Sequence, residues 1–318
     1  MTDPIPAWPG ELVDLPSHRV WVRSAPAETA PAEPALFVHG LGGSGTNWTD
    51  LMGILRTPGA GGPDPAVPAL DGEAVDLPGF GFSPVPADGD YSVNAKAQVL
   101  VELIERRHRW PVHLVGNSLG GAVCTRVAAQ RPDLVRTLTL VSPALPDLRP
   151  RLIPLRVTVI CVPKLGPWLV RRAEMRPAEL RTDGVVREVY QDPALMHPAR
   201  RAEEIAELLR RDELGYGDDV LIRSARGLVA EYARPGPRSL WRDAARVRAP
   251  VLVLYGSHDR LVSPARAARA ARAFPSARVL VLPRTGHVAM MERPAWVARE
   301  MRTLISDTAD ARKTHLHR

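Results

Sequence analysis

A single serine interrupts the apolar stretch HLVGNSLGGAV, residues 113–123, and lies in the pattern Gly-x-Ser-x-Gly formed by Gly116, Ser118 and Gly120. The residues before Ser118 predict a buried strand and those after it an apolar helix, which places the serine at a strand-to-helix turn. A serine hydroxyl is a poor nucleophile unless a base, oriented by a third group, removes its proton. Chemistry at Ser118 therefore requires a histidine and a carboxylate elsewhere in the chain. The alternative is that Ser118 is only the N-cap of the helix.

Among the nine histidines, His287 is the best candidate for the base, because it follows the last apolar run in PRTGH. A loop at that carboxyl edge of a parallel sheet can reach the serine turn. His258, His113 and His108 are interpreted as surface or strand-end residues. Asp259, in VLVLYGSHDRLV, leaves the preceding run and is the best candidate for the acid. A carboxylate there would hold the imidazole in the tautomer that accepts the serine proton.

Short apolar runs alternate with longer helical patterns, which indicates a mostly parallel sheet covered by helices on both faces. The expected strands are HRVWVRS, PALFVHG, GEAVDLPG, VHLVGNS, RTLTLVSPAL, PVLVLYG and ARVLVLPRTGH. The expected helices cover residues 46–55, 92–109, 119–130, 264–273 and 294–306. Residues 56–72 predict a glycine- and proline-rich loop, and residues 307–318 a frayed polar tail. The alternation stops at residues 146–240, where an arginine-rich helical segment predicts an insertion.

The chain resembles the α/β-hydrolase family in five segments, which occur in the family's order: FVHGLGGSGTNW, DLPGFGFS, VGNSLGG, YGSHDRLV and GHVAMMERP. The resemblance extends over residues 34–145 and 249–300, about half of the chain. It implies an α/β fold with a mostly parallel, doubly wound sheet and a helical cap inserted after the sixth strand. The implied division is a core domain of residues 1–145 and 241–318 and a cap, or lid, of residues 146–240.

The same resemblance implies an oxyanion hole, formed by the backbone N–H groups of Leu41 and Leu119, which would stabilise developing negative charge. His39, just before this loop, is interpreted as a loop-fixing residue, and Asp76 as a carboxylate that anchors a loop. The glycines after His39 let the backbone approach the substrate closely. The residues expected to contact substrate are Gly40, Gly42, Trp168, Val262 and Val288.

The expected reaction is hydrolysis of carboxylic esters of hydrophobic substrates through an acyl-enzyme on Ser118, as in a carboxylesterase or lipase. Dehalogenases and most epoxide hydrolases of the family place aspartate where this chain has Ser118, so both activities are disfavoured. A carbon-carbon bond hydrolase of ring-cleavage diketones, a cofactor-free haloperoxidase-like hydrolase and a thioesterase remain alternatives on the same triad. A small-molecule sensor with a slow triad is the alternative from a different class.

Composition narrows the range of partners. The 318 residues carry a formal charge of +7, but the excess arginines form no basic stripe interleaved with aromatic residues, so nucleic-acid binding is not expected. The densest positive region, residues 149–181, includes the apolar stretch LIPLRVTVICVPKLGPWLVRR. It predicts either a cap helix over the site or a weak contact with an anionic membrane surface. Neither H-E-x-x-H nor paired C-x-x-C occurs, so no metal or other cofactor is expected.

The first residues, MTDPIPAWPGELVDLP, contain neither the basic region nor the continuous apolar region of a signal peptide. No stretch is long and apolar enough to predict a membrane-spanning helix. Cys124 and Cys161 lie in apolar segments and predict no disulfide framework. These features predict a cytoplasmic protein, with peripheral membrane contact at most, and they leave the oligomeric state open.

Overall fold

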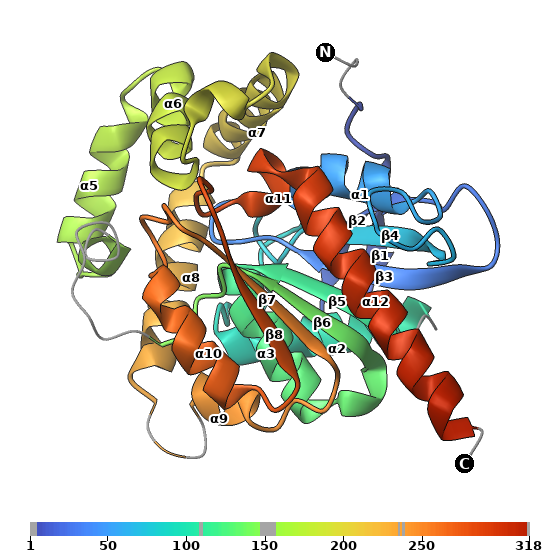
Figure 1. Cartoon of the computed structure of the whole chain (residues 1–318). Helices are drawn as coiled ribbons and strands as arrows, with labels where there is room; N and C mark the ends of the chain where they lie inside the picture. Colours follow the sequence, from blue (N-terminus) through green and yellow to red (C-terminus); the bar gives the residue numbers. More distant parts are fainter. Residues whose placement is uncertain (1–4, 108–110, 147–156, 235, 237–238, 317–318) are drawn as a thin grey trace.

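The computed structural model describes residues 5–107, 111–146, 157–234, 236 and 239–316, and its central element is an eight-stranded sheet (Figure 1). The strand order is β1-β2-β4-β3-β5-β6-β7-β8, in which β1 and β2 are antiparallel to their neighbours and the other six strands are parallel. The predicted mostly parallel sheet is therefore confirmed. The strands are β1 (Gly10–Asp14), β2 (Arg19–Ala25), β3 (Ala32–Val38), β4 (Ala69–Val75), β5 (Val112–Asn117), β6 (Val135–Val141), β7 (Val251–Gly256) and β8 (Ala277–Leu282).

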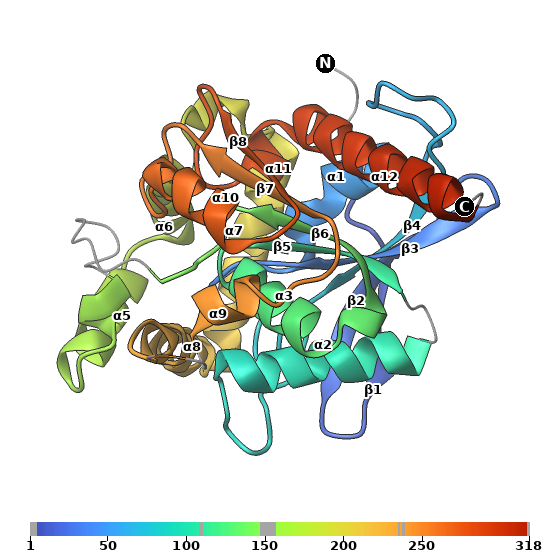
Figure 2. The same ribbon diagram turned by 60° about the horizontal axis from the view of Figure 1, so that its bottom comes forward.

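Helices cover both faces of this sheet (Figure 2). Every residue of β5 and β7 is buried, as expected for parallel strands that are covered on both sides. One face packs against α2 (Val93–Arg107), α3 (Leu119–Gln130), α9 (Leu240–Ala244) and α10 (Ala267–Ala273). The other face packs against α1 (Thr49–Leu55), α11 (Ala289–Glu292) and α12 (Pro294–Leu316). The continuous apolar runs of the sequence are thus the two-sided core of a doubly wound sheet.

Three segments differ from the sequence-based expectation. β1 was not predicted, because Val13 is its only buried residue and an edge strand of this kind has no apolar pattern. β4 begins at Ala69, inside the segment predicted as a loop, because residues 69–72 pair with the start of β3. The predicted frayed tail is helical as far as Leu316, since residues 307–316 include neither glycine nor proline to end α12.

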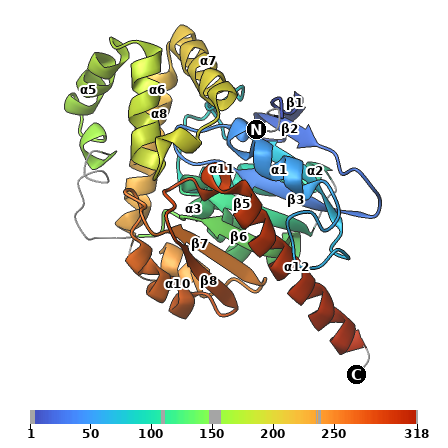
Figure 3. The same cartoon turned by 45° about the horizontal axis from the view of Figure 1, so that its top comes forward.

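Between β6 and β7 the described residues form four longer helices, grouped beside the sheet domain (Figure 3). They are α5 (Leu165–Glu174), α6 (Ala178–Val189), α7 (Pro198–Leu214) and α8 (Gly217–Tyr232). The predicted helical insertion after the sixth strand is confirmed, while the cap boundaries of residues 146–240 stay a prediction. Residues 149–156 of the predicted basic stretch lie outside the described residues. No helix within the described ranges is both long and apolar enough to cross a bilayer.

Candidate active site

Ser118 lies at the sharp turn between β5 and α3, with φ of +51° and ψ of −114°. Positive φ is strained for a residue with a side chain, and such strain concentrates at functional sites. The turn requires glycine on both sides, because a Cβ at Gly116 would lie 2.6 Å from the carbonyl oxygen of Gly120, and one at Gly120 would lie 2.6 Å from that of His39. Ser118 occupies the N-cap position of α3, but its hydroxyl makes no capping bond to that helix. The capping alternative therefore does not explain this serine.

His287 and Asp259 are brought together by the loops that follow β8 and β7. Nδ1 of His287 lies 2.9 Å from Oδ2 of Asp259, and both side chains are buried. Oδ1 of Asp259 accepts the backbone N–H groups of Leu261 and Val262, each at 2.8 Å. Burial acts to raise the pKa of Asp259, but the charge interaction with His287 and the hydrogen bonds from His287 and the Val262 N–H outweigh it and lower the pKa. Asp259 is therefore held as a carboxylate that accepts the Nδ1–H of His287.

Asn117, the residue before Ser118, joins the histidine loop to the serine turn. Its buried Nδ2 donates to the carbonyl oxygen of His287 at 3.2 Å and to that of Val141 at 3.0 Å. These bonds hold the backbone of His287 beside the turn, and both His287 and Ser118 line one cavity. Sequence reasoning did not single out Asn117. The available signal was a polar side chain at the carboxyl end of a mostly apolar strand.

The loop that follows β3 passes close to Ser118. A Cβ built at Gly40 would lie 3.2 Å from the Cβ of Ser118, so the backbone of Leu41 comes next to the turn. Leu119 is the first residue of α3, and the N–H groups at the start of a helix lack partners within the helix. Leu119 therefore follows Ser118 directly, and Leu41 follows the glycine that lies beside the turn, while the role of their N–H groups as an oxyanion hole stays a prediction.

Two buried side chains hold the surrounding loops in place. Nε2 of His39 accepts the Leu77 N–H at 2.9 Å, so Nδ1 carries the proton and donates it to the Gly40 carbonyl oxygen at 2.7 Å. Burial lowers the pKa of His39 to about 4, which keeps the ring neutral at physiological pH. Asp76 accepts the Gly45 N–H at 2.6 Å and a second backbone N–H with its other oxygen. Both residues lie in the anchoring positions predicted for them.

A cavity of about 920 Å³ lies over Ser118, between the cap helices and the sheet domain. Trp168 is a correction to the predicted lining, because it does not line this cavity and is 57% exposed. Val170, two residues further along α5, does face the cavity. Residues two apart lie on opposite sides of a helix, so Trp168 faces away from the cavity. The predicted residues that do line the cavity are Ser118, His287, Gly40, Leu41, Gly42, Val262 and Val288.

The cavity also has a polar wall, which sequence reasoning missed. Glu204, Glu207 and Arg211 lie three and then four residues apart along α7, and all three line the cavity. Oε1 of Glu204 accepts the Asn47 Nδ2–H at 2.9 Å, and Arg211 donates to the Gly42 carbonyl oxygen at 3.4 Å. Burial and then the charge of Glu207 raise the pKa of Glu204 to about 7. The spacing was visible in the sequence, but a charged helix face is usually solvated.

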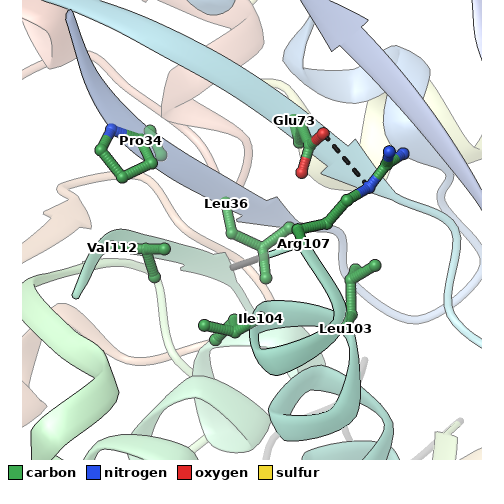
Figure 4. A pocket seen from close by; sticks show the side chains of 8 residues that line it. Pro34, Leu36, Glu73, Leu103, Ile104, Arg107 and Val112 are labelled. Carbon is green, nitrogen blue, oxygen red and sulfur yellow. Dashed lines mark ion pairs between the residues drawn. The ribbon is translucent and has the colours of Figure 1, made fainter. Parts of the chain in front are cut away.

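A second hollow lies at the opposite ends of the parallel strands. Figure 4 shows it between Pro34 at the start of β3, Val112 at the start of β5 and the end of α2. There Nε of Arg107 lies 3.5 Å from Oε1 of Glu73. The volume of this hollow is about 10 Å³, room for about one water molecule. It is a gap in packing, and the large cavity at Ser118 is the candidate site.

Known proteins match this chain over most of its length. Residues 35–300 match the model of the Alpha/beta hydrolase family. Lipase 1 of Psychrobacter immobilis is 27% identical over 267 residues, which cover 82% of this chain and 73% of the lipase. The dihydrolipoyllysine-residue acetyltransferase component of the acetoin cleaving system of Cupriavidus necator is 28% identical over 266 residues, which cover 82% of this chain and 60% of that protein. The two relatives are thus named for different activities, one as a lipase and the other as an acetyltransferase component.

The fold itself recurs in solved structures. A thermophilic esterase from Thermogutta terrifontis has a TM-score of 0.69 to this chain at 22% identity, and the match covers 94% of this chain and 99% of the esterase. That likeness agrees with the strand order and with the helical insertion after β6. Because the family model spans well over half of the sequence, the chain belongs to the alpha/beta hydrolase family.

Proposed function

We propose that this protein is a serine hydrolase that cleaves carboxylic esters of hydrophobic substrates. The observation that carries the proposal is the position of Ser118, a strained serine at the N-terminus of α3 that shares a cavity with a histidine bonded to a buried carboxylate. A serine that only capped a helix would need neither partner. Membership of the hydrolase family and the presence of a lipase among the relatives support the same reading.

The first half of the proposed reaction acylates the serine. Nε2 of His287 accepts the hydroxyl proton of Ser118 while Oγ bonds to the ester carbonyl carbon. The N–H groups of Leu41 and Leu119 stabilise the oxyanion that forms, and a donor of this kind contributes about 3 kcal/mol. Asp259 stabilises the imidazolium. The carbon-oxygen bond to the alcohol then breaks, His287 gives its proton to the leaving oxygen, and an acyl-serine remains.

The second half releases the acid. His287 accepts a proton from a water molecule while the water oxygen bonds to the acyl carbon, and the same N–H groups stabilise the second oxyanion. Collapse of this intermediate breaks the bond to Ser118 Oγ, which recovers its proton from His287. The enzyme returns to its starting state, and no cofactor takes part in the proposed cycle.

The apolar part of the cavity supports a hydrophobic substrate. Each methylene group buried there contributes roughly 0.8 kcal/mol to binding, so hydrophobic acyl or alcohol groups gain affinity until the space is filled. The volume of about 920 Å³ is in the range of cavities that enclose a drug-sized ligand. The apolar side chains that line it include Leu180, Val185, Val186, Val189, Leu221, Val262 and Val288.

Labelling with a fluorophosphonate, together with a substrate screen, tests the assignment. Wild-type protein should be labelled at Ser118 and should hydrolyse aryl esters, and Ser118→Ala should lose both properties while keeping its thermal midpoint. Labelling that persists elsewhere on the chain in Ser118→Ala would reject the nucleophile. If the protein hydrolyses no ester but does turn over a thioester or a ring-cleavage diketone, the esterase assignment would be replaced by the corresponding hydrolase. Tight binding of a small ligand without turnover would favour the sensor.

We also propose that the cap contacts anionic membrane surfaces. The α5 surface, as we call it, combines exposed apolar side chains with exposed positive charges. Met175 is 83% exposed, and the guanidinium of Arg172 lies 5.9 Å from the ring centre of Trp168. Apolar side chains flanked by arginine suit the headgroup region of an anionic bilayer. The α5 surface consists of Val162, Lys164, Leu165, Trp168, Arg171, Arg172, Met175 and Arg176.

A further inference from the structure

The cap backbone is in direct contact with the loop that carries His287. The N–H of His287 donates to the carbonyl oxygen of Val189, the last residue of α6, at 2.7 Å. The neighbouring Gly286 approaches the cap so closely that a Cβ there would lie 2.6 Å from the backbone nitrogen of Gln191. The histidine therefore takes its backbone position from the cap as well as from the sheet domain.

Glu292, on α11, bridges the same two segments. Its Oε2 accepts the Gly286 N–H at 2.6 Å, and its Oε1 accepts the N–H of Gln191 in the cap. The residue is only 6% exposed, so water does not compete strongly for the carboxylate. Hydrogen bonds from N–H groups to an ionised carboxylate are about twice as strong as those to a neutral acceptor. One side chain thus fastens the residue before His287 to the residue two positions beyond α6.

We infer that Glu292 is a positioning residue for His287 and that it works by fastening the histidine loop to the cap. This inference rests on the proposed role of His287 as the base. If the cap moves away, the bond from His287 to Val189 and the bond from Gln191 to Glu292 must break together. The cap therefore does more than cover the substrate: its closed position orders the base beside Ser118.

A carboxylate is required because both of its oxygens face N–H donors. In Glu292→Gln one of these positions is taken by an NH₂ group, so one of the two short bonds is lost. If the lost bond is the one from Gly286, that N–H keeps only its longer bond of 3.3 Å to Oε1. A displacement of about 1 Å in a base can cost on the order of 100-fold in rate. We expect kcat to fall about 10-fold to 100-fold with KM changed by less than about twofold, because substrate contacts are untouched.

The matched control is Glu300→Gln. Glu300 is as buried as Glu292, but it lies on α12 and pairs with Arg278 at 2.6 Å, away from the histidine loop. Glu292→Gln should slow fluorophosphonate labelling of Ser118 as much as it lowers kcat, while Glu300→Gln should leave both rates near wild type. Equal effects of the two variants, or a Glu292→Gln enzyme within twofold of wild type, would overturn the inference.

Hydrogen exchange read by mass spectrometry tests the link without any chemistry at Ser118. Glu292→Gln should speed exchange in the peptides covering residues 187–193 and 283–292. Glu300→Gln should leave exchange in both peptides unchanged. Faster exchange in residues 283–292 alone would show that the cap is not attached through Glu292. If wild-type protein is not labelled at Ser118, the proposed function fails, but this exchange result still decides whether the link exists.

A second variant breaks the same bond from the cap side, because proline has no N–H and its ring carbon pushes the Glu292 carboxylate away from the nitrogen of residue 191. Gln191→Pro lacks the N–H that Glu292 accepts, and Tyr190 already has the extended backbone, with φ of −88° and ψ of 146°, that a residue before proline favours. It should lower kcat and the labelling rate in the same direction as Glu292→Gln. A folded Gln191→Pro protein with wild-type rates would reject the contribution of the cap.

Discussion

The way in which Asp259 uses its two oxygens decides which nitrogen of His287 carries the proton. Oδ1 accepts two backbone N–H groups, so in Asp259→Asn the amide oxygen takes that place and the NH₂ group faces Nδ1 of His287. The proton must then move to Nε2, which can no longer accept one from Ser118. We expect turnover to fall on the order of 10⁴-fold, by analogy with the same substitution in a serine protease.

Turnover of the purified Asp259→Asn protein, alongside its circular dichroism and thermal midpoint, checks this expectation. The far-ultraviolet spectrum should match wild type, since the amide oxygen still accepts both backbone N–H groups. Near-normal turnover in a folded variant would mean that a different carboxylate orients His287.

At the scale of secondary-structure elements, α7 brings an unusual carboxyl group against the loop that follows β3. Burial and then the charge of Glu207 raise the pKa of Glu204 from 4.5 to about 7. The charge of Glu203 also raises this pKa, while the charge of Arg211 and the hydrogen bond from Asn47 lower it. The folded protein therefore binds this proton more tightly than the unfolded chain. The stability that Glu204 contributes is present in full below pH 4.5 and is lost as the pH rises through about 7.

Glu204→Gln, which stays uncharged, should therefore have a higher thermal midpoint than wild type at pH 8, and the difference should shrink toward zero near pH 4.5. Scanning calorimetry at several pH values measures it. Glu213→Gln is the control, because it makes the same charge change at an exposed position on the same helix. A midpoint difference that is independent of pH would contradict the raised pKa.

At the scale of the whole molecule, helix α5 lies at the outer side of the cap, away from α12 (Figure 3). Sedimentation with phosphatidylcholine vesicles should increase when phosphatidylglycerol is added and should weaken as salt is raised, because exposed charges are screened. The double variant Arg171→Glu/Arg172→Glu should lose this binding. The double variant Arg246→Glu/Arg248→Glu makes the same charge change at exposed positions before β7 and should keep most of it. Equal losses in both would indicate binding by overall charge and would reject the α5 surface.

The sequence by itself determined the class of fold and the candidate reacting groups. Strands buried on both faces appear as mostly apolar runs, because every residue of β5 and β7 is buried. Ser118 was recognisable because its turn admits only glycine at positions 116 and 120, and both glycines lie within two residues of it in the sequence. His287 and Asp259 followed from their places after successive apolar runs. Each of these features depends on local pattern and on chain order.

Only the tertiary structure decided which helix face meets which loop. The hydrophobic pattern of α5 does not predict that Val170 faces the cavity and Trp168 faces outward. Which side of a helix faces a cavity depends on the elements that pack against it. Glu204 reads in the sequence as part of a solvated helix face, yet it contacts a loop 157 residues away. Glu292 and Gln191 are 101 residues apart in the chain, and their contact arises because the sheet brings the histidine loop under the cap. Contacts between residues so distant in the chain leave no local pattern.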